Sequence, residues 1–259
     1  MYKCQVCLYF SGYDKLKPYG FSIHGAICGY SRRILWMEVV RSNKNPSVIA
    51  EIFLNCVKEV GGCPMRVRTD CGTENVLLPA MQCYLRADGT DECAGEKAHV
   101  YGSSPANQRI EAWWSFLRRS RSGWWIDFFQ DMSQQGLLEI GNAYHMEALW
   151  YCISKLLQED LTQVKDHWNS HYIRKSHHET VSGIPDILYF LPEYYGGENC
   201  LMDISAVKLS EMEERTNSNT VEDIYKEYFD YVLESKGWLY PEDIQEGFQM
   251  FLHLVNIPQ

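Results

Sequence analysis

The sequence Arg-Thr-Asp-Cys-Gly-Thr-Glu-Asn at residues 68–75 is the most informative stretch, because it places an acid, Asp70, at the end of a short apolar strand. A second acid, Glu111, lies within residues 105–119, where apolar side chains recur at helical spacing. Two carboxylates placed in this way can share divalent metal ions, and such ions are a common means of cutting and joining phosphodiesters. The same chemistry normally uses a third carboxylate on an earlier strand. At the two positions considered for that acid, the chain has Ser11 and Cys28.

Outward from this stretch, the pattern of apolar residues predicts alternating strands and helices. Strands are predicted at residues 19–27, 33–40, 65–69 and 98–101, and helices at residues 46–60, 75–85 and 105–119. Asn45 as N-cap, Pro46 at the first helical position and Gly61 after the end support the first of these helices. Further helices are predicted within residues 124–170 and at residues 221–234 and 241–255. The order combines an antiparallel hairpin with parallel crossovers, which is typical of an α/β domain.

The composition limits the classes of protein to which this chain can belong. Its 259 residues suffice for one sizeable α/β domain with an appendage. Of the net charge of −10, the part from Gly196 onward carries −9, with thirteen acids and four bases. The nearly neutral remainder can hold a local basic patch for a phosphate backbone. Because ten cysteines occur without a secretion signal or an apolar run of membrane length, we expect a reduced, intracellular protein outside the membrane.

Several motifs together resemble the integrase core domain of retroelements and DNA transposons, with the closest likeness to transposon-derived integrase-core proteins of animals. These motifs lie at residues 15–21, 23–27, 29–32, 68–75, 107–114, 168–174 and 183–185. The resemblance covers about residues 11–192. It implies a ribonuclease H-like fold, in which helices flank a mixed five-stranded sheet. It also implies polynucleotidyl transfer, with three acids holding two Mg²⁺ or Mn²⁺ ions.

The resemblance assigns the acids of this site residue by residue. It places the second acid on Asp70 and the glutamate on Glu111, which makes both of them catalytic residues and metal ligands. Ser11 stands where the first acid is expected, and Cys28 stands where relatives have a further acid. Asp14 is the candidate substitute, although its odd spacing from Ser11 along a strand points it to the other face. Without the family context, Asp70 would be a strand-end acid that caps a turn, and Glu111 a solvated helix residue.

Basic residues near these motifs are candidates for contact with DNA. Arg118, Arg119 and Arg121 follow the helix that holds Glu111, and they either meet phosphates or complement the helix dipole at a solvated end. The remaining nucleic-acid candidates are Lys15, Lys17, Arg32, Arg33, Asn107 and Arg109.

These observations predict four segments and leave three functions open. The segments are a non-family stretch at residues 1–10, a ribonuclease H core at 11–125, its helical continuation at 126–195 and an acidic helical tail at 196–259. The first hypothesis is a nuclear, transposon-derived integrase-core protein that has lost efficient catalysis and binds DNA or protein. The alternatives are an active polynucleotidyl transferase dependent on Mg²⁺ or Mn²⁺, and a purely structural interaction protein. The resemblance also implies a homodimer, and the acidic tail suits a protein partner.

Overall fold

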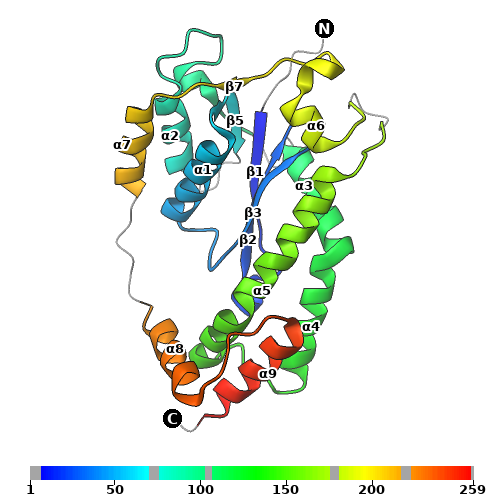
Figure 1. Ribbon diagram of the computed structural model, residues 1–259, viewed down its shortest axis with the longest axis vertical. Helices are drawn as coiled ribbons and strands as arrows, with labels where there is room; N and C mark the ends of the chain where they lie inside the picture. Colours follow the sequence, from blue (N-terminus) through cyan, green and yellow to red (C-terminus); the bar gives the residue numbers. More distant parts are fainter. Residues whose placement is uncertain (1–6, 70–75, 103–106, 176–180, 217–222, 258–259) are drawn as a thin grey trace.

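The protein is built around one mixed sheet, which runs through the middle of the computed structural model in Figure 1. The structure describes residues 7–69, 76–102, 107–175, 181–216 and 223–257. The strand order is β3-β2-β1-β5-β6, with β1 (Cys7–Tyr13), β2 (Ser22–Cys28), β3 (Ile34–Val40), β5 (Arg66–Thr69) and β6 (His99–Tyr101). β1, β2 and β3 pair antiparallel, whereas β5 and β6 extend the sheet parallel to β1. The expected five-stranded, helix-flanked sheet is confirmed.

Helices cover both faces of this sheet (Figure 1). One face packs against α1 (Pro46–Val60) and α2 (Leu77–Leu85), and the other against α3 (Gln108–Leu117), α4 (Gly123–Gln134) and α5 (Ala143–Ser170). Side chains of β1 alternate between the two cores, as the pleat of a strand requires. Leu8 and Phe10 belong to the α1–α2 core, and Tyr13 belongs to the α3–α5 core.

The first helix has the predicted ends. The Asn45 side chain accepts a hydrogen bond from the Ser47 backbone N–H, and Pro46 occupies the first helical position. Gly61 ends the helix with φ 73°, a left-handed conformation that glycine adopts without a steric cost. The predicted range of residues 46–60 is confirmed.

The outer edge of β3 is capped by side chains from α5 rather than by another strand. Asn169 accepts a hydrogen bond from the Ile34 backbone N–H and donates one to the Ile34 carbonyl. The Gln158 side chain likewise bonds to the β3 backbone: it accepts a hydrogen bond from the Val39 N–H and donates one to the Met37 carbonyl. These bonds satisfy buried backbone groups and block an edge that would otherwise invite pairing with another chain.

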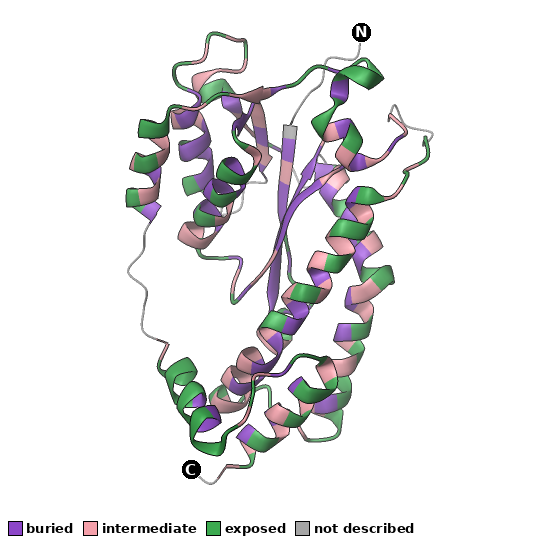
Figure 2. Cartoon of the chain, viewed as in Figure 1, coloured by how far each residue is buried: buried purple, intermediate pink, exposed green. Residues whose placement is uncertain are grey.

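The C-terminal part of the chain contacts both cores. It contains α6 (Pro185–Phe190), a helical turn (Pro192–Tyr195), α7 (Ala206–Thr216), α8 (Ile224–Lys236) and α9 (Ile244–Val255), and its β7 (Leu201–Met202) pairs with β4 (Cys63–Pro64). Met212 of α7 joins the α1–α2 core, whereas Phe229 of α8 and Phe251 of α9 join the α3–α5 core. Figure 2 shows buried positions on these helices where they approach the body. The last helices are therefore part of the packed structure.

A buried histidine makes the stability of the fold depend on pH. His24 of β2 is fully buried, and its Nδ1 accepts a hydrogen bond from Trp36 Nε1 at 3.1 Å. Burial lowers the pKa of His24 from 6.5 to about 4. Because the unfolded chain binds this proton more tightly, the stability contributed by neutral His24 is complete above pH 6.5 and is lost as the pH falls toward 4. The expected loss is on the order of 3 kcal/mol.

Urea unfolding at a series of pH values between neutrality and acid measures this loss. His24→Gln is the control, because it keeps an acceptor for Trp36 and removes the titrating group. The variant is expected to lose most of the slope in this range. An equal slope in both proteins would show that other groups cause it.

Candidate active site

Ser11, which the sequence motifs place at the position of the first acid, lies beside Glu111. Ser11 lies in β1, two residues before Tyr13, and residues two apart on a strand share a face. Ser11 therefore faces the side of the sheet on which α3 packs, as Tyr13 does. Its Oγ donates a long hydrogen bond of 3.4 Å to Oε1 of Glu111, which lies in the first turn of α3. Ser11 is buried and Glu111 is exposed. The structure therefore brings these two sequence-predicted positions into contact.

A glycine on the neighbouring strand allows α3 to approach. Gly25 of β2 lies opposite Ser11 in the register of the sheet. A Cβ atom at Gly25 would lie 2.6 Å from Cη2 of Trp114, which follows Glu111 by three residues on α3. Gly25 thus supports the site although it was not among the predicted site residues. Its signal in the sequence is a glycine inside an apolar strand, which indicates the close approach of another group.

Asp70 lies outside the described residues, but the strand that precedes it is described. Thr69, the last residue of β5, is buried, and its Oγ1 lies 3.0 Å from Nε2 of His99 on β6. β5 is the parallel neighbour of β1, so it lies beside the strand that carries Ser11. Asn107, just before α3, is also buried, and its Oδ1 has no hydrogen-bond partner in the described part of the chain.

Asp14 is engaged elsewhere. Its carboxylate accepts hydrogen bonds from Asn43 Nδ2 at 2.9 Å and from Lys17 Nζ at 3.1 Å. Asn43 packs so closely on Gly12 that a Cβ there would meet its Nδ2 at 2.4 Å. Partial burial raises the pKa of Asp14, but the hydrogen bonds from Asn43 and Lys17 outweigh burial and hold the pKa below its usual value. Gly12 follows Ser11 within β1 and therefore faces the other side of the sheet. Asp14 lies just past the end of β1 and is bonded to the same Asn43 that packs on Gly12.

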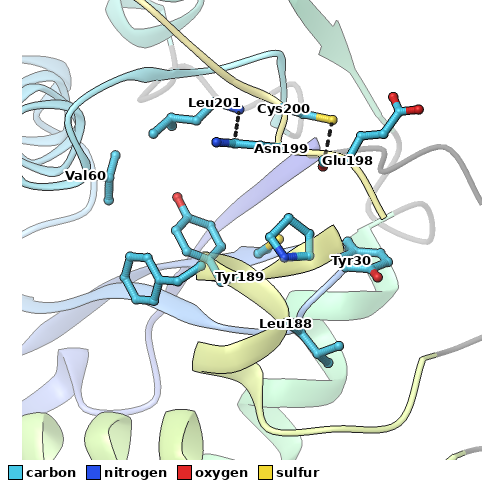
Figure 3. Close-up of a pocket in the computed structure, with 11 residues that line it drawn as sticks. Tyr30, Val60, Leu188, Tyr189, Glu198, Asn199, Cys200 and Leu201 are labelled. Atoms are coloured by element: carbon cyan, nitrogen blue, oxygen red, sulfur yellow. Dashed lines mark hydrogen bonds between the residues drawn. The ribbon is translucent and has the colours of Figure 1, made fainter. Parts of the chain in front are cut away.

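Cys28, the other position at which the sequence motifs predict a lost acid, lies away from Glu111. It is buried in the α1–α2 core, whereas α3 packs on the opposite face of the sheet. Together with Tyr30, Tyr189 and Cys200 it lines a cavity of about 80 Å³, whose surroundings Figure 3 shows. Of the two substituted positions, Ser11 is therefore the one that shares a face with Glu111.

Comparison with known families agrees with this geometry. Residues 5–189 match the model of a family described as Integrase core domain. The chain belongs to the integrase core domain family. The match begins before residue 11, where the sequence motifs place the start of the resemblance, and it includes all of β1. No curated protein matches the chain.

Family membership indicates which type of domain the chain carries. The chain carries a polynucleotidyl-transferase-like domain of transposon or retroelement descent. Integrase core domains typically use divalent metal ions and generally bind DNA. None of the described helices is long and apolar enough to cross a membrane.

The described residues of this integrase core do not by themselves fit a two-metal site. Within the described ranges, no three His, Cys, Asp or Glu side chains gather in a way that could hold a metal ion. Ser11 and Glu111 supply one neutral hydroxyl and one carboxylate. Mg²⁺ prefers hard anionic oxygens in octahedral geometry, so this pair offers too little negative charge for two ions.

Some of the predicted DNA-contacting residues have partners within the protein. Arg121 pairs with Asp160 at 2.7 Å, and the same carboxylate accepts a hydrogen bond from Trp125 Nε1. Arg33 pairs with Asp186 at 2.7 Å. Lys17 pairs with Asp14. These contacts give Arg33 and Arg121 a place in the packing of the domain, whereas the Lys17–Asp14 pair is exposed.

Other predicted DNA-contacting residues are exposed. Arg118 and Arg119 are exposed in a π-helical turn (Arg118–Ser122) that joins α3 to α4. Neither forms an ion pair with another described residue. Arg118 follows Glu111 by seven residues, about two helical turns, and so lies on the same side of the helix. Lys15 is also exposed.

Proposed function

We propose that this integrase core protein has lost efficient catalysis and acts as a nucleic-acid-binding module. The observation that carries the proposal is the Ser11 hydroxyl beside Glu111, on the α3 face of the central strand. A serine at the position of the first acid removes one negative charge and one hard ligand from the set that the family uses. Metal affinity and phosphoryl transfer then fall together.

Binding is a separate property, because it needs cations rather than metal ligands. Arg118 and Arg119 present two exposed guanidinium groups in the π-helical turn that directly follows α3, the helix that carries Glu111. Guanidinium groups contact phosphates through a planar fork of N–H donors. The retained basic face supports a chain that still holds a polynucleotide after losing the chemistry. Nuclear localisation, a homodimer and a protein partner for the acidic tail belong to the same proposal.

The salt dependence of DNA binding tests this proposal. Arg118→Gln together with Arg119→Gln is expected to weaken binding to duplex DNA of any sequence and to lower the slope of log K against log salt by about two. The matched control is Lys155→Gln with Lys236→Gln, which removes the same charge from exposed positions on α5 and α8. The control is expected to bind as the unaltered chain does. Equal losses in both variants, or no binding by the unaltered chain, would overturn the proposal.

The alternative is a working metal-dependent polynucleotidyl transferase. The retention of Glu111 in the first turn of α3, next to the Ser11 position, favours this alternative. Nicking or joining of DNA by the unaltered chain in Mn²⁺ separates it from the first proposal.

A further inference from the structure

The C-terminal helix α8 and the helix α5, which lie side by side in Figure 1, form an aromatic cavity between them. Its volume of about 230 Å³ is far more than the roughly 10–15 Å³ that one water molecule needs. The aromatic rings that line it come from α5, from α8 and from the segment after α8, and they are Trp150, Tyr151, Tyr225, Phe229 and Tyr240. The family match ends at residue 189, so the last three of these rings lie outside it.

Two of these rings already hold a cation of the chain over their faces. The Arg41 guanidinium lies 4.7 Å from the ring centroid of Trp150, and the Lys155 ammonium lies 5.3 Å from that of Tyr240. Both distances are within the range of about 6 Å over which a ring face attracts a cation. Lys155 also pairs with Glu159 at 3.9 Å. No described lysine or arginine lies over the other three rings, so their faces are not used in this way.

The charged side chains that line the cavity leave it with a net charge of −1. Three of them are carboxylates and two are cations: Glu147, Asp223, Asp230, Arg41 and Lys226. One further positive charge inside the cavity would balance the lining, whereas an anion would be repelled. The charge therefore favours a ligand with a single positive charge.

The carboxylates of the lining already accept hydrogen bonds. Arg41 donates to carboxylates on α5 and at the start of α8, at 2.6 Å and 3.0 Å. Asp230 accepts from the Tyr151 hydroxyl at 2.7 Å and from Lys226 Nζ at 2.6 Å. An ammonium group with N–H donors would have to compete for these acceptors, because a buried donor without a partner is costly. A trimethylammonium group has no N–H to satisfy, and it needs only ring faces and a negative surrounding charge.

We propose that this cavity binds the trimethylammonium group of a methylated lysine on a basic peptide. The free ring faces of Tyr151, Tyr225 and Phe229 supply the attraction, and the net charge of the lining is neutralised on binding. A peptide is favoured over the choline headgroup of a lipid, because the chain carries −9 from Gly196 onward and repels the phosphate that adjoins choline. The proposal is independent of nucleic-acid binding as the proposed function.

Ligand-observed NMR of the full chain with Nα-acetyl-trimethyllysine N-methylamide tests this site. The neutral analogue, in which a tert-butyl group replaces trimethylammonium, is expected to bind at least about tenfold more weakly, because it keeps the shape and loses the charge. The unmethylated lysine derivative is also expected to bind more weakly, since its N–H donors compete for acceptors that are already used.

Tyr225→Ala removes one ring of the cavity and is expected to weaken binding of the trimethyllysine derivative by about two- to fivefold. Tyr225 is 40% exposed, so its truncation is expected to leave the fold intact. The matched control is Tyr231→Ala, because Tyr231 is 68% exposed on the same helix and lies outside the lining. The control is expected to bind as the unaltered chain does, and thermal unfolding checks that both variants are folded.

The comparison of ligands in the unaltered chain decides the proposal even if a variant fails to fold. Equal binding of the trimethyllysine derivative and its neutral analogue would overturn the site, as would equal binding by Tyr225→Ala and Tyr231→Ala. Tighter binding of the unmethylated derivative would show a site for an ordinary ammonium group, and the methylated assignment would be wrong. Tighter binding of glycerophosphocholine would overturn the assignment to a peptide.

Discussion

Ser11→Asp is expected to raise Mn²⁺-dependent nicking and joining of DNA by roughly a thousandfold or more over the unaltered chain. The Ser11 hydroxyl lies 3.4 Å from Glu111, so an aspartate there would place a second carboxylate within reach of the same ions. Restoring a ligand of a two-metal site stabilises the transition state by several kcal/mol, and each 1.4 kcal/mol is a factor of ten in rate. The measurement is product formation on branched and blunt DNA under single-turnover conditions.

Three controls identify the source of any activity. Glu111→Gln is expected to abolish the activity of the Ser11→Asp background. Ser115→Asp adds the same charge one turn further along α3, on the exposed side, and is expected to stay inactive. Cys28→Asp puts its carboxylate in the α1–α2 core and is also expected to be inactive. Activity in the unaltered chain that Glu111→Gln removes would show that catalysis is intact and that the proposed impairment is wrong.

Phe251→Ala is expected to destabilise the whole domain by about 3–5 kcal/mol, the usual cost of emptying a large buried aromatic site. Phe251 of α9 is fully buried in the core formed by α3–α5, where its ring lies edge-on to His145. If the C-terminal helices are part of that core, urea unfolding shows one transition with a lower midpoint. Leu239→Ala is the matched control, because Leu239 is 86% exposed and its truncation is expected to change stability by less than about 0.5 kcal/mol.

A different unfolding pattern would contradict this account of the C-terminal helices. Two separate transitions, with Phe251→Ala moving only the smaller, would mean that α8 and α9 unfold as an independent unit. A loss no larger than that of Leu239→Ala would mean that α9 adds little to the core.

Local patterns predicted the elements whose boundary signals lie within their own sequence. The helix at residues 46–60 has an N-cap, a proline and a glycine in the right places, and the structure has the same range. The strand β1 was not predicted from the pattern of apolar residues. Because β2 and β5 flank it and helices cover both of its faces, its side chains do not show a simple alternation of apolar and polar residues. The helix α7 was also missed, since it buries few side chains and its apolar stripe is correspondingly weak.

For the candidate site too, the sequence predicted some features and only the tertiary structure decided others. The motifs alone identified the family, because family motifs depend on the order and type of residues. The same motifs predict Asp70 and Glu111 as acid positions and a missing first acid, and these assignments stay predictions. Which substituted position faces Glu111 depends on strand register and pleat, and only the tertiary structure places Ser11 there and Cys28 in the other core.

Side-chain partners that lie far apart in the sequence were also revealed only by the tertiary structure. Among similar-looking arginines, Arg121 pairs with Asp160, whereas Arg32 is buried and donates to the Val181 carbonyl. The sequence by itself determined the fold family, because the motifs that identify the family are local patterns, and from the same patterns it predicted the residue types at the site. The tertiary structure decided which of those groups meet, because contacts between distant residues depend on how the helices pack on the sheet.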